Sequence, residues 1–141
     1  QVQDSVAAGA RLLEGGRRLP REGFFYAPTV LADVAPGQPA FDGETFGPVA
    51  ALIEARDAEH AVELANHSDY GLSGALWTAD VERAHELAVR LVTGAVFING
   101  SSTSDPRVPI GGVKQSGFGR ELSHFGLREF VNAQTVWLDR R

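Results

Sequence analysis

The feature that most constrains the fold is a regular alternation of apolar runs and helical segments in the middle of the chain. Val49–Ile53 is a continuous apolar run, typical of a strand buried on both faces. Gly74–Thr78 and Ala95–Ile98 follow as two further strands. Between them lie two amphipathic segments, each opened by an aspartate of the kind that caps a helix, Asp57 and Asp80. This order predicts an α/β fold with a parallel βαβαβ sheet covered by helices.

The first third of the chain is less regular. Apolar residues recur three or four apart from Val2 to Leu13, which predicts a helix that ends at the glycine pair Gly15-Gly16. Residues 17–48 are rich in proline, glycine and aromatic side chains. This composition indicates an ordered, irregular segment with one short strand near Thr29–Leu31.

The last third is predicted as a loop over 99–121, a helix over roughly 122–130 and a final strand, Ala133–Leu138. This strand has no hairpin partner nearby, and both edges of the predicted sheet are unpaired, whereas complete domains normally cover such edges. The first residues also read as helix with no N-cap before them. We therefore expect the chain to be a piece of a longer protein and, when isolated, to expose apolar surface.

Composition excludes several kinds of chemistry. The 141 residues contain no cysteine, so this chain has no disulfide, no thiolate metal ligand and no cysteine nucleophile. A formal net charge of -5, without a stripe of Lys and Arg, argues against nucleic acid or an anionic membrane as a partner. No apolar run is long enough to cross a bilayer and no signal peptide opens the sequence. We expect a cytoplasmic protein, although a missing N-terminus would also remove a targeting segment.

The sequence contains none of the common glycine-rich cofactor-binding motifs or the serine-hydrolase motif in complete form. Gly117-Phe118-Gly119 begins like a dinucleotide fingerprint, but Leu122 stands where the third glycine belongs. Gly111–Lys114 lacks the spacing of a P-loop and the hydroxyl residue after the lysine, and no Gly-x-Ser-x-Gly elbow exists. The four histidines are scattered, which predicts solvated or capping roles and no metal site.

Two segments carry more specific signals. Glu44-Thr45-Phe46-Gly47-Pro48 places a carboxylate and an aromatic ring in one irregular loop, suited to sugar hydroxyls or, alternatively, holding an exposed glutamate beside a core phenylalanine. Pro109–Glu121 has four glycines in nine residues. These glycines indicate backbone that passes close to another group, or several left-handed positions. The alternative is a tight turn system at a subunit contact.

Together these segments resemble the C-terminal third of aldehyde dehydrogenases. The matching motifs are Glu-x-Phe-Gly-Pro-Val at Glu44–Val49, Asn-x-x-x-Tyr-Gly-Leu-Ser-Gly at Asn66–Gly74, and Gly-Gly-x-Lys-x-Ser-Gly-x-Gly-Arg-Glu at Gly111–Glu121. The similarity runs essentially from Gln1 to Trp137. Each motif is moderately specific by itself, and all of them in register are highly specific.

The resemblance implies NAD(P)-dependent oxidation of an aldehyde. In this family a cysteine thiolate attacks the aldehyde, hydride passes to the nicotinamide, and a glutamate base assists hydrolysis of the thioester. The cysteine and the base belong upstream, so this chain holds no catalytic residue and is expected to be inactive alone. Glu44 resembles the glutamate that binds the nicotinamide ribose, and Phe46 the aromatic that packs beside the nicotinamide ring. Neither residue decides between NAD and NADP.

The substrate-entrance loop of the family corresponds to Ser101–Pro109. Relative to Pro109, Ser104 stands where succinate-semialdehyde dehydrogenases place a serine that binds the distal carboxylate of the substrate. The residues after Gly119 also resemble bacterial members of that group. Ile110 departs from the pattern, because the family usually has Phe there.

The resemblance divides the chain into an incomplete catalytic-domain part, 1–129, and an oligomerisation strand and tail, 130–141, which implies a homo-oligomer. The expected function is therefore a segment of an aldehyde dehydrogenase whose substrate is a small aldehyde. The alternative is an inactive truncated product that acts as an oligomerisation or interaction module. A free-standing dinucleotide-binding domain is disfavoured by the failed glycine fingerprints.

Overall fold

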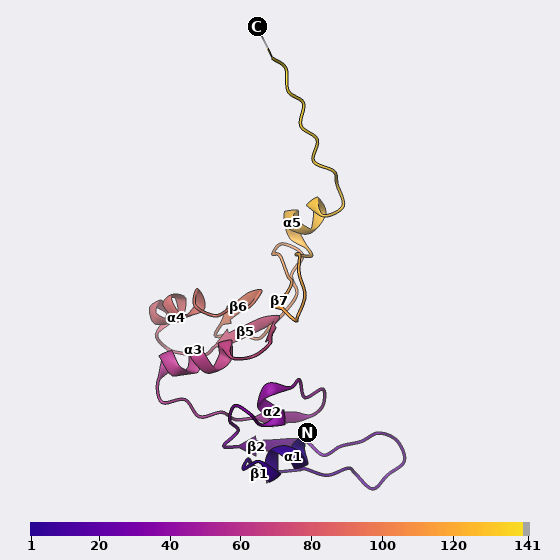
Figure 1. The fold of residues 1–141 in the computed structure, drawn as a ribbon, viewed down its shortest axis with the longest axis vertical. Coiled ribbons are helices and arrows are strands. Elements are labelled where there is room, and N and C mark those ends of the chain that lie inside the picture. Colours follow the sequence, from indigo (N-terminus) through magenta and orange to yellow (C-terminus); the bar gives the residue numbers. More distant parts are fainter. Residues whose placement is uncertain (140–141) are drawn as a thin grey trace. The chain divides into compact units, whose positions relative to one another are not determined.

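The structure is a computed structural model that describes residues 1–139, and the chain divides into two units, Gln1–Ser68 and the residues from Asp69 onward (Figure 1). The first unit contains α1 (Val2–Ala7), β1 (Arg11–Glu14), β2 (Thr29–Ala32), α2 (Pro39–Asp42), β3 (Val49–Ala51) and α3 (Ala58–Asn66). The second unit contains β4 (Tyr70–Gly71), β5 (Ser73–Leu76), α4 (Val81–Ala88), β6 (Ala95–Ile98), β7 (Val113–Lys114) and α5 (Ser123–Arg128).

A three-stranded mixed sheet organises the first unit. The central strand β2 pairs antiparallel with β1 and parallel with β3. Leu31, in the middle of β2, is fully buried. The apolar core around it consists of Val2, Ala10, Leu31, Val34 and Ala40, with Tyr26, Phe41, Val49 and Ala51 packed against it. The predicted strand near Thr29–Leu31 is therefore confirmed as the centre of this sheet.

The predicted N-terminal helix is wrong in its second half. The helix α1 ends at Ala7, and Gly9 follows with a φ of 110°, a conformation that suits glycine and breaks the helical path. The chain then enters β1, where Leu12 pairs with Leu31. The spacing of Val2, Ala10 and Leu13 fits a helix, but pairing with β2 decides the conformation.

Both aspartate caps are confirmed. The Asp57 carboxylate accepts a hydrogen bond from the backbone N–H of His60 at 2.8 Å, at the start of α3. The Asp80 carboxylate accepts one from the backbone N–H of Arg83 at 2.9 Å, at the start of α4. Each bond satisfies a donor that has no partner within its own helix.

The second unit is built on one strand–helix–strand element. The strands β5 and β6 pair in parallel with Ser73 opposite Ala95, and α4 connects them. This helix buries Ala84 and Leu87. A second, antiparallel pair is formed by β4 and β7, with Gly71 opposite Val113.

The prediction of one continuous parallel βαβαβ sheet is therefore wrong for the described residues. The parallel pairing of β5 with β6 in the second unit is as expected. The strand β3 instead pairs with β2, and both of these strands belong to the first unit. The strand β2 comes from the irregular, proline-rich segment, where periodicity gives little signal. A short apolar run such as Val49–Ile53 does not specify its partner strand.

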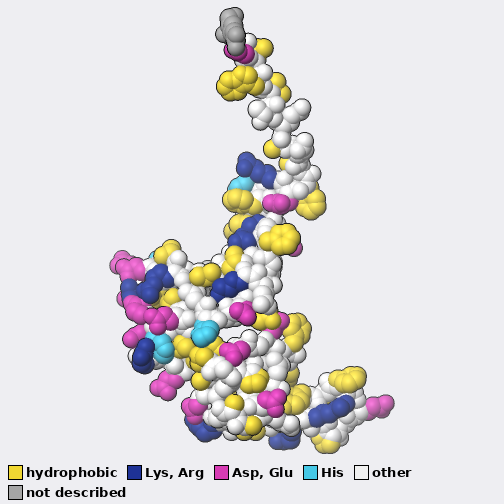
Figure 2. Space-filling model, viewed as in Figure 1, with side chains coloured by type: hydrophobic (Ala, Val, Ile, Leu, Met, Phe, Trp, Pro, Cys, Tyr) yellow, Lys and Arg dark blue, Asp and Glu magenta, His cyan; other side chains and the backbone are white. Residues whose placement is uncertain are grey.

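The helix α5 is confirmed within the predicted range, but the predicted strand Ala133–Leu138 is not formed in the described residues (Figure 1). In Figure 2 hydrophobic side chains stand out near the end of the terminal segment. Trp137 is 86% exposed, and Val136 and Leu138 are similarly open to solvent. The predicted exposed apolar surface is thus observed. Residues 140–141 of the predicted tail lie outside the described residues.

Within residues 1–139, no helix is long and apolar enough to span a membrane.

Replacing Gly94 by alanine is expected to destabilise the second unit. A Cβ at this position overlaps the carbonyl oxygen of Gly111, and Leu72 O lies only 3.1 Å away. Because these contacts are backbone atoms, the strain requires a backbone shift, which costs about 1–3 kcal/mol. Urea unfolding of the purified protein measures this loss.

The matched control is Gly100→Ala, since the nearest atom to a Cβ there is Ile98 O at 3.9 Å. We expect its free energy of unfolding to change by less than about 0.5 kcal/mol. Equal stabilities of the two variants would show that the contact between Gly94 and Gly111 is not tight.

Candidate functional site

The loop that carries Glu44 and Phe46 lies between α2 and β3 and has a fixed backbone. The Gln1 side-chain amide donates to the carbonyl oxygen of Glu44 at 3.0 Å. The Gly47 N–H donates to Thr45 O at 2.9 Å, and the Val49 N–H donates to Gly47 O at 2.8 Å. The backbone bonds leave both predicted side chains directed to solvent, and the Phe46 ring is 93% exposed.

A groove of about 520 Å³ borders this loop in the first unit. Its aromatic walls are Phe24, Tyr26 and Phe46, and its polar edge includes Gln1 and Asp4. Phe24 is 99% exposed, so two aromatic rings are open to a partner on the same groove. An open ring face suits a planar heterocycle, and the neighbouring Glu44 carboxylate suits sugar hydroxyls. The residues present therefore fit the nicotinamide half of a dinucleotide.

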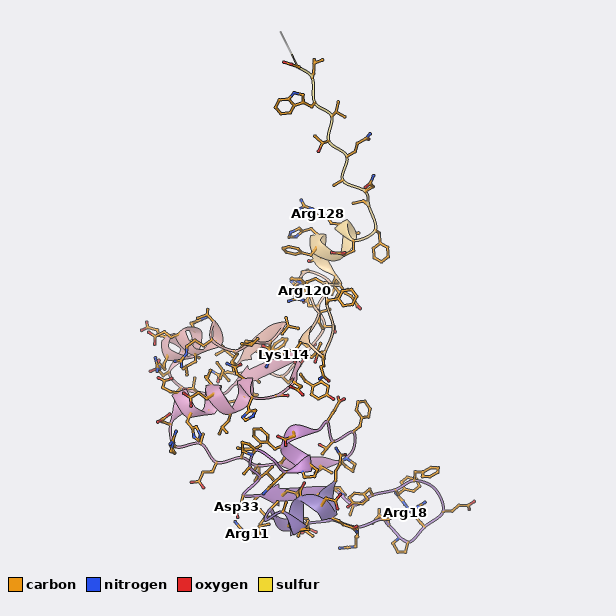
Figure 3. The ribbon with its side chains drawn as sticks, in the orientation of Figure 1. Arg11, Arg18, Asp33, Lys114, Arg120 and Arg128 are labelled. Carbon is orange, nitrogen blue, oxygen red and sulfur yellow. The ribbon has the colours of Figure 1, made fainter. Side chains whose placement is uncertain are left out.

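The glycine-rich segment of the second unit is held by close backbone packing. The N–H of Gly94 donates to Gly71 O at 3.0 Å, and Ser116 Oγ accepts from the Gly71 N–H at 3.0 Å. A Cβ on Gly112 would collide with Ser116. The Arg120 guanidinium donates to the carbonyl oxygens of Gly112 and Gly119 at 3.0 and 2.6 Å (Figure 3). Gly111 and Gly112 are thus needed for close backbone approach, whereas Gly117 and Gly119 have open space and positive φ values of 125° and 77°, the left-handed conformation that favours glycine.

Ser104 lies on the loop between β6 and β7, and its side chain is exposed. It borders a groove of about 1180 Å³ in the second unit. Other lining residues come from the glycine-rich segment and α5 and include the exposed Phe118, Leu127 and Phe130. The structure therefore joins the serine loop and the glycine-rich segment around one open groove.

The serine loop contains an ion pair that sequence reasoning missed. Arg107 Nη2 lies 2.6 Å from Asp105 Oδ2, and Arg107 Nε lies 2.9 Å from Asp105 Oδ1. The side-chain hydrogen bond from Arg107, followed by the bond from its backbone N–H, holds the pKa of Asp105 below its usual value. Asp105 is therefore ionised at neutral pH. The sequence Asp-Pro-Arg-Val, a typical turn sequence, was the available signal.

The predicted site residues fall into two groups. Glu44 and Phe46 lie together in the first unit, and Ser104 lies in the second unit. The structure describes each group by itself.

Three of the four histidines have local contacts. His60 Nδ1 accepts from the Arg56 N–H at 3.2 Å, beside the cap of α3. His67 packs edge-to-face on Phe41, and His124 packs on Phe125. Among residues 1–139, no three side chains of His, Asp or Glu are grouped as a metal site would need.

Replacing Ser116 by alanine is expected to loosen the glycine-rich segment. The buried residue Gly71 would lose the acceptor of its N–H, at a cost of about 1–2 kcal/mol in the free energy of unfolding. Chemical denaturation measures the loss. In the control variant Ser102→Ala, an exposed hydroxyl pair with Ser73 is removed, and we expect almost no change. A Ser116→Ala variant as stable as this control would contradict the assigned bond.

Known proteins of one family match both units of this chain. The model of the aldehyde dehydrogenase family matches residues 1–136. The Escherichia coli protein named succinate semialdehyde dehydrogenase (NAD(P)+) Sad is 59% identical over 140 residues, covering 99% of this chain and 30% of that protein. The chain thus spans about 30% of the length of the curated relatives it matches.

Solved structures of aldehyde dehydrogenases match the fold of this chain. The Streptococcus pyogenes succinic semialdehyde dehydrogenase in complex with NADP+ has a TM-score of 0.93 and 37% identity, covering 99% of this chain and 30% of that one. The NAD+ complex of an aldehyde dehydrogenase from Bacillus cereus has a TM-score of 0.92 and 34% identity, covering 99% and 28%. The resemblance predicted from three motifs is confirmed over nearly the whole sequence, and the chain belongs to the aldehyde dehydrogenase family.

Proposed function

We propose that this chain is the C-terminal part of an NAD(P)-dependent aldehyde dehydrogenase that oxidises succinate semialdehyde to the dicarboxylic acid. The observation that carries the proposal is 59% identity, over 99% of the chain, to a protein named succinate semialdehyde dehydrogenase. Relatives from Synechocystis and Deinococcus radiodurans with similar names, at 48% and 50% identity, support the same substrate class.

In this proposal the loop before β3 positions the cofactor. The Glu44 carboxylate accepts hydrogen bonds from the nicotinamide ribose, and the open Phe46 ring packs beside the nicotinamide. When bound, the nicotinamide supplies the hydride acceptor. The hydrogen bonds along this loop support the role, because they hold the backbone from which both side chains project.

Ser104 binds the distal carboxylate of the substrate in the same proposal. Its hydroxyl is exposed on the groove beside the glycine-rich segment, where an extended substrate can reach it. A hydroxyl donor to a carboxylate forms a charge-assisted bond, which favours succinate semialdehyde over an uncharged aldehyde of equal length.

The remaining parts of the enzyme lie outside this sequence. With no cysteine there is no thiolate to form the acyl intermediate, so this chain alone is proposed to be inactive. Residues 1–129 form part of the catalytic domain. The segment 130–141 carries the oligomerisation strand, Ala133–Leu138, which forms when it pairs with a neighbouring subunit of a homo-oligomer in the cytoplasm, a role supported by the open apolar side chains at Val136 and Trp137.

In the full-length enzyme, Ser104→Ala is expected to raise the KM for succinate semialdehyde about tenfold, because one charge-assisted hydrogen bond is lost. The KM for butanal, which has no distal carboxylate, is expected to stay within about twofold. NAD(P)H formation followed by absorbance measures both.

The same assay tests the proposal itself. The full-length enzyme is expected to prefer succinate semialdehyde to butanal, and the chain alone to form no NAD(P)H with either. If the full-length enzyme shows no such preference, succinate semialdehyde is not its specific substrate. If the chain alone forms NAD(P)H, catalysis does not need an upstream cysteine.

A second substitution tests the cofactor site. Glu44→Gln is expected to lower kcat/KM for the cofactor about tenfold, since a neutral amide is a weaker acceptor for ribose hydroxyls than a carboxylate. The control is Glu54→Gln, which neutralises another exposed glutamate of the first unit and is expected to leave the cofactor kinetics unchanged. Equal kinetics of the two variants would contradict the assignment of Glu44.

A further inference from the structure

The loop that carries Ser104 is anchored to the rest of the second unit on both sides. Before it, the Asn99 side chain donates to Thr78 O and accepts from the Thr78 N–H, both at 2.8 Å. After it, Ile110 and Glu121 exchange two backbone hydrogen bonds at 2.9 and 2.7 Å. The loop between these anchors spans residues 100–109.

Directly after Ser104 the chain forms a closed turn. The Val108 N–H donates to Asp105 O at 3.1 Å, with Pro106 at the second position of the turn. The Ser123 N–H donates to Pro106 O at 3.0 Å, which ties the turn to the start of α5. The turn therefore begins at the residue that directly follows Ser104.

Arg107 donates hydrogen bonds to both oxygens of the Asp105 carboxylate. Asp105 Oδ1 accepts from both the backbone N–H and Nε of Arg107, each at 2.9 Å, and Oδ2 accepts from Nη2 at 2.6 Å. The pair is close to solvent, with side-chain exposures of 86% for Arg107 and 32% for Asp105. The bidentate geometry helps to fix the turn, while the exposure of the pair keeps its contribution to folding stability modest.

The fork also acts on the charge of the loop that carries Ser104. Asp105 directly follows Ser104 and precedes Pro106, and both of these neighbours border the groove, so an uncompensated Asp105 carboxylate would add negative charge near an incoming anionic substrate. The guanidinium cancels this charge and fixes the direction in which the carboxylate points.

We propose that Arg107 is a specificity-determining positioning residue, which neutralises and holds Asp105 so that Ser104 can receive an anionic substrate. This inference rests on the proposed function. It assigns Arg107 no direct contact with the substrate, because its guanidinium is engaged by Asp105.

The experiment compares Arg107→Ala, Asp105→Asn and the double variant in the full-length enzyme, with succinate semialdehyde and with butanal. For Arg107→Ala we expect a KM for succinate semialdehyde about tenfold higher, an unchanged kcat, and a penalty that shrinks with added salt. Removing the uncompensated carboxylate in the double variant should restore this KM to within about threefold of the original value. The KM for butanal should stay constant throughout.

Arg83→Ala is the matched control, because Arg83 makes an exposed 2.6 Å ion pair with Glu86 on α4. It should leave every KM unchanged. If the double variant is as impaired as Arg107→Ala, or if butanal is affected equally, the inference is overturned.

The outcome for Ser104→Ala separates this inference from the proposed function. If that variant binds succinate semialdehyde normally, the loop does not bind the carboxylate and both proposals are overturned. If that variant is impaired while Arg107→Ala is not, only the role of Arg107 is overturned.

Discussion

The second unit depends on backbone atoms that approach one another without side chains between them. Gly94 sits against the carbonyl of Gly111, and Gly71 bonds both Gly94 and Ser116. These contacts hold the glycine-rich segment against the β5–β6 pair and fix the direction in which the chain continues to α5. Gly111, Gly112 and Ser116 of this packed segment also line the groove beside Ser104. A methyl group on Gly71 or Gly94 would collide with backbone atoms and push the segment outward. These two residues therefore matter to the site although they have no reactive side chain.

Local signals in the sequence were sufficient to predict elements that satisfy their own hydrogen bonds, such as capped helices. Asp57 and Asp80 precede amphipathic segments, and both cap helices as predicted. Pairing partners were harder to predict. The strand β3 was predicted to extend a parallel sheet with β5, yet it pairs with β2, because a three-residue apolar strand accepts any edge that tertiary structure offers. Residues 11–14 fit a helix by spacing and form a strand for the same reason.

The candidate site was predicted in part, and mainly through resemblance to a family. Composition and spacing alone left Glu44 and Phe46 with two interpretations, and nothing local distinguished Ser104 from its neighbouring serines. The Asp105–Arg107 fork was missed because an i,i+2 pair has no periodic signature and depends on a turn that the sequence only suggests. The groove residues come from segments separated along the chain, so only the fold groups them.

The terminal segment has a practical consequence through its fluorescence. The chain has two tryptophans, and Trp137 lies on the apolar stretch after α5 with its indole open to water. Indole emission moves to shorter wavelength when the ring leaves water for an apolar contact. With Trp77 replaced by phenylalanine, the remaining fluorophore reports directly on whether this segment is covered. The chain therefore carries an intrinsic optical probe of the exposure of its terminal segment, which needs no added label.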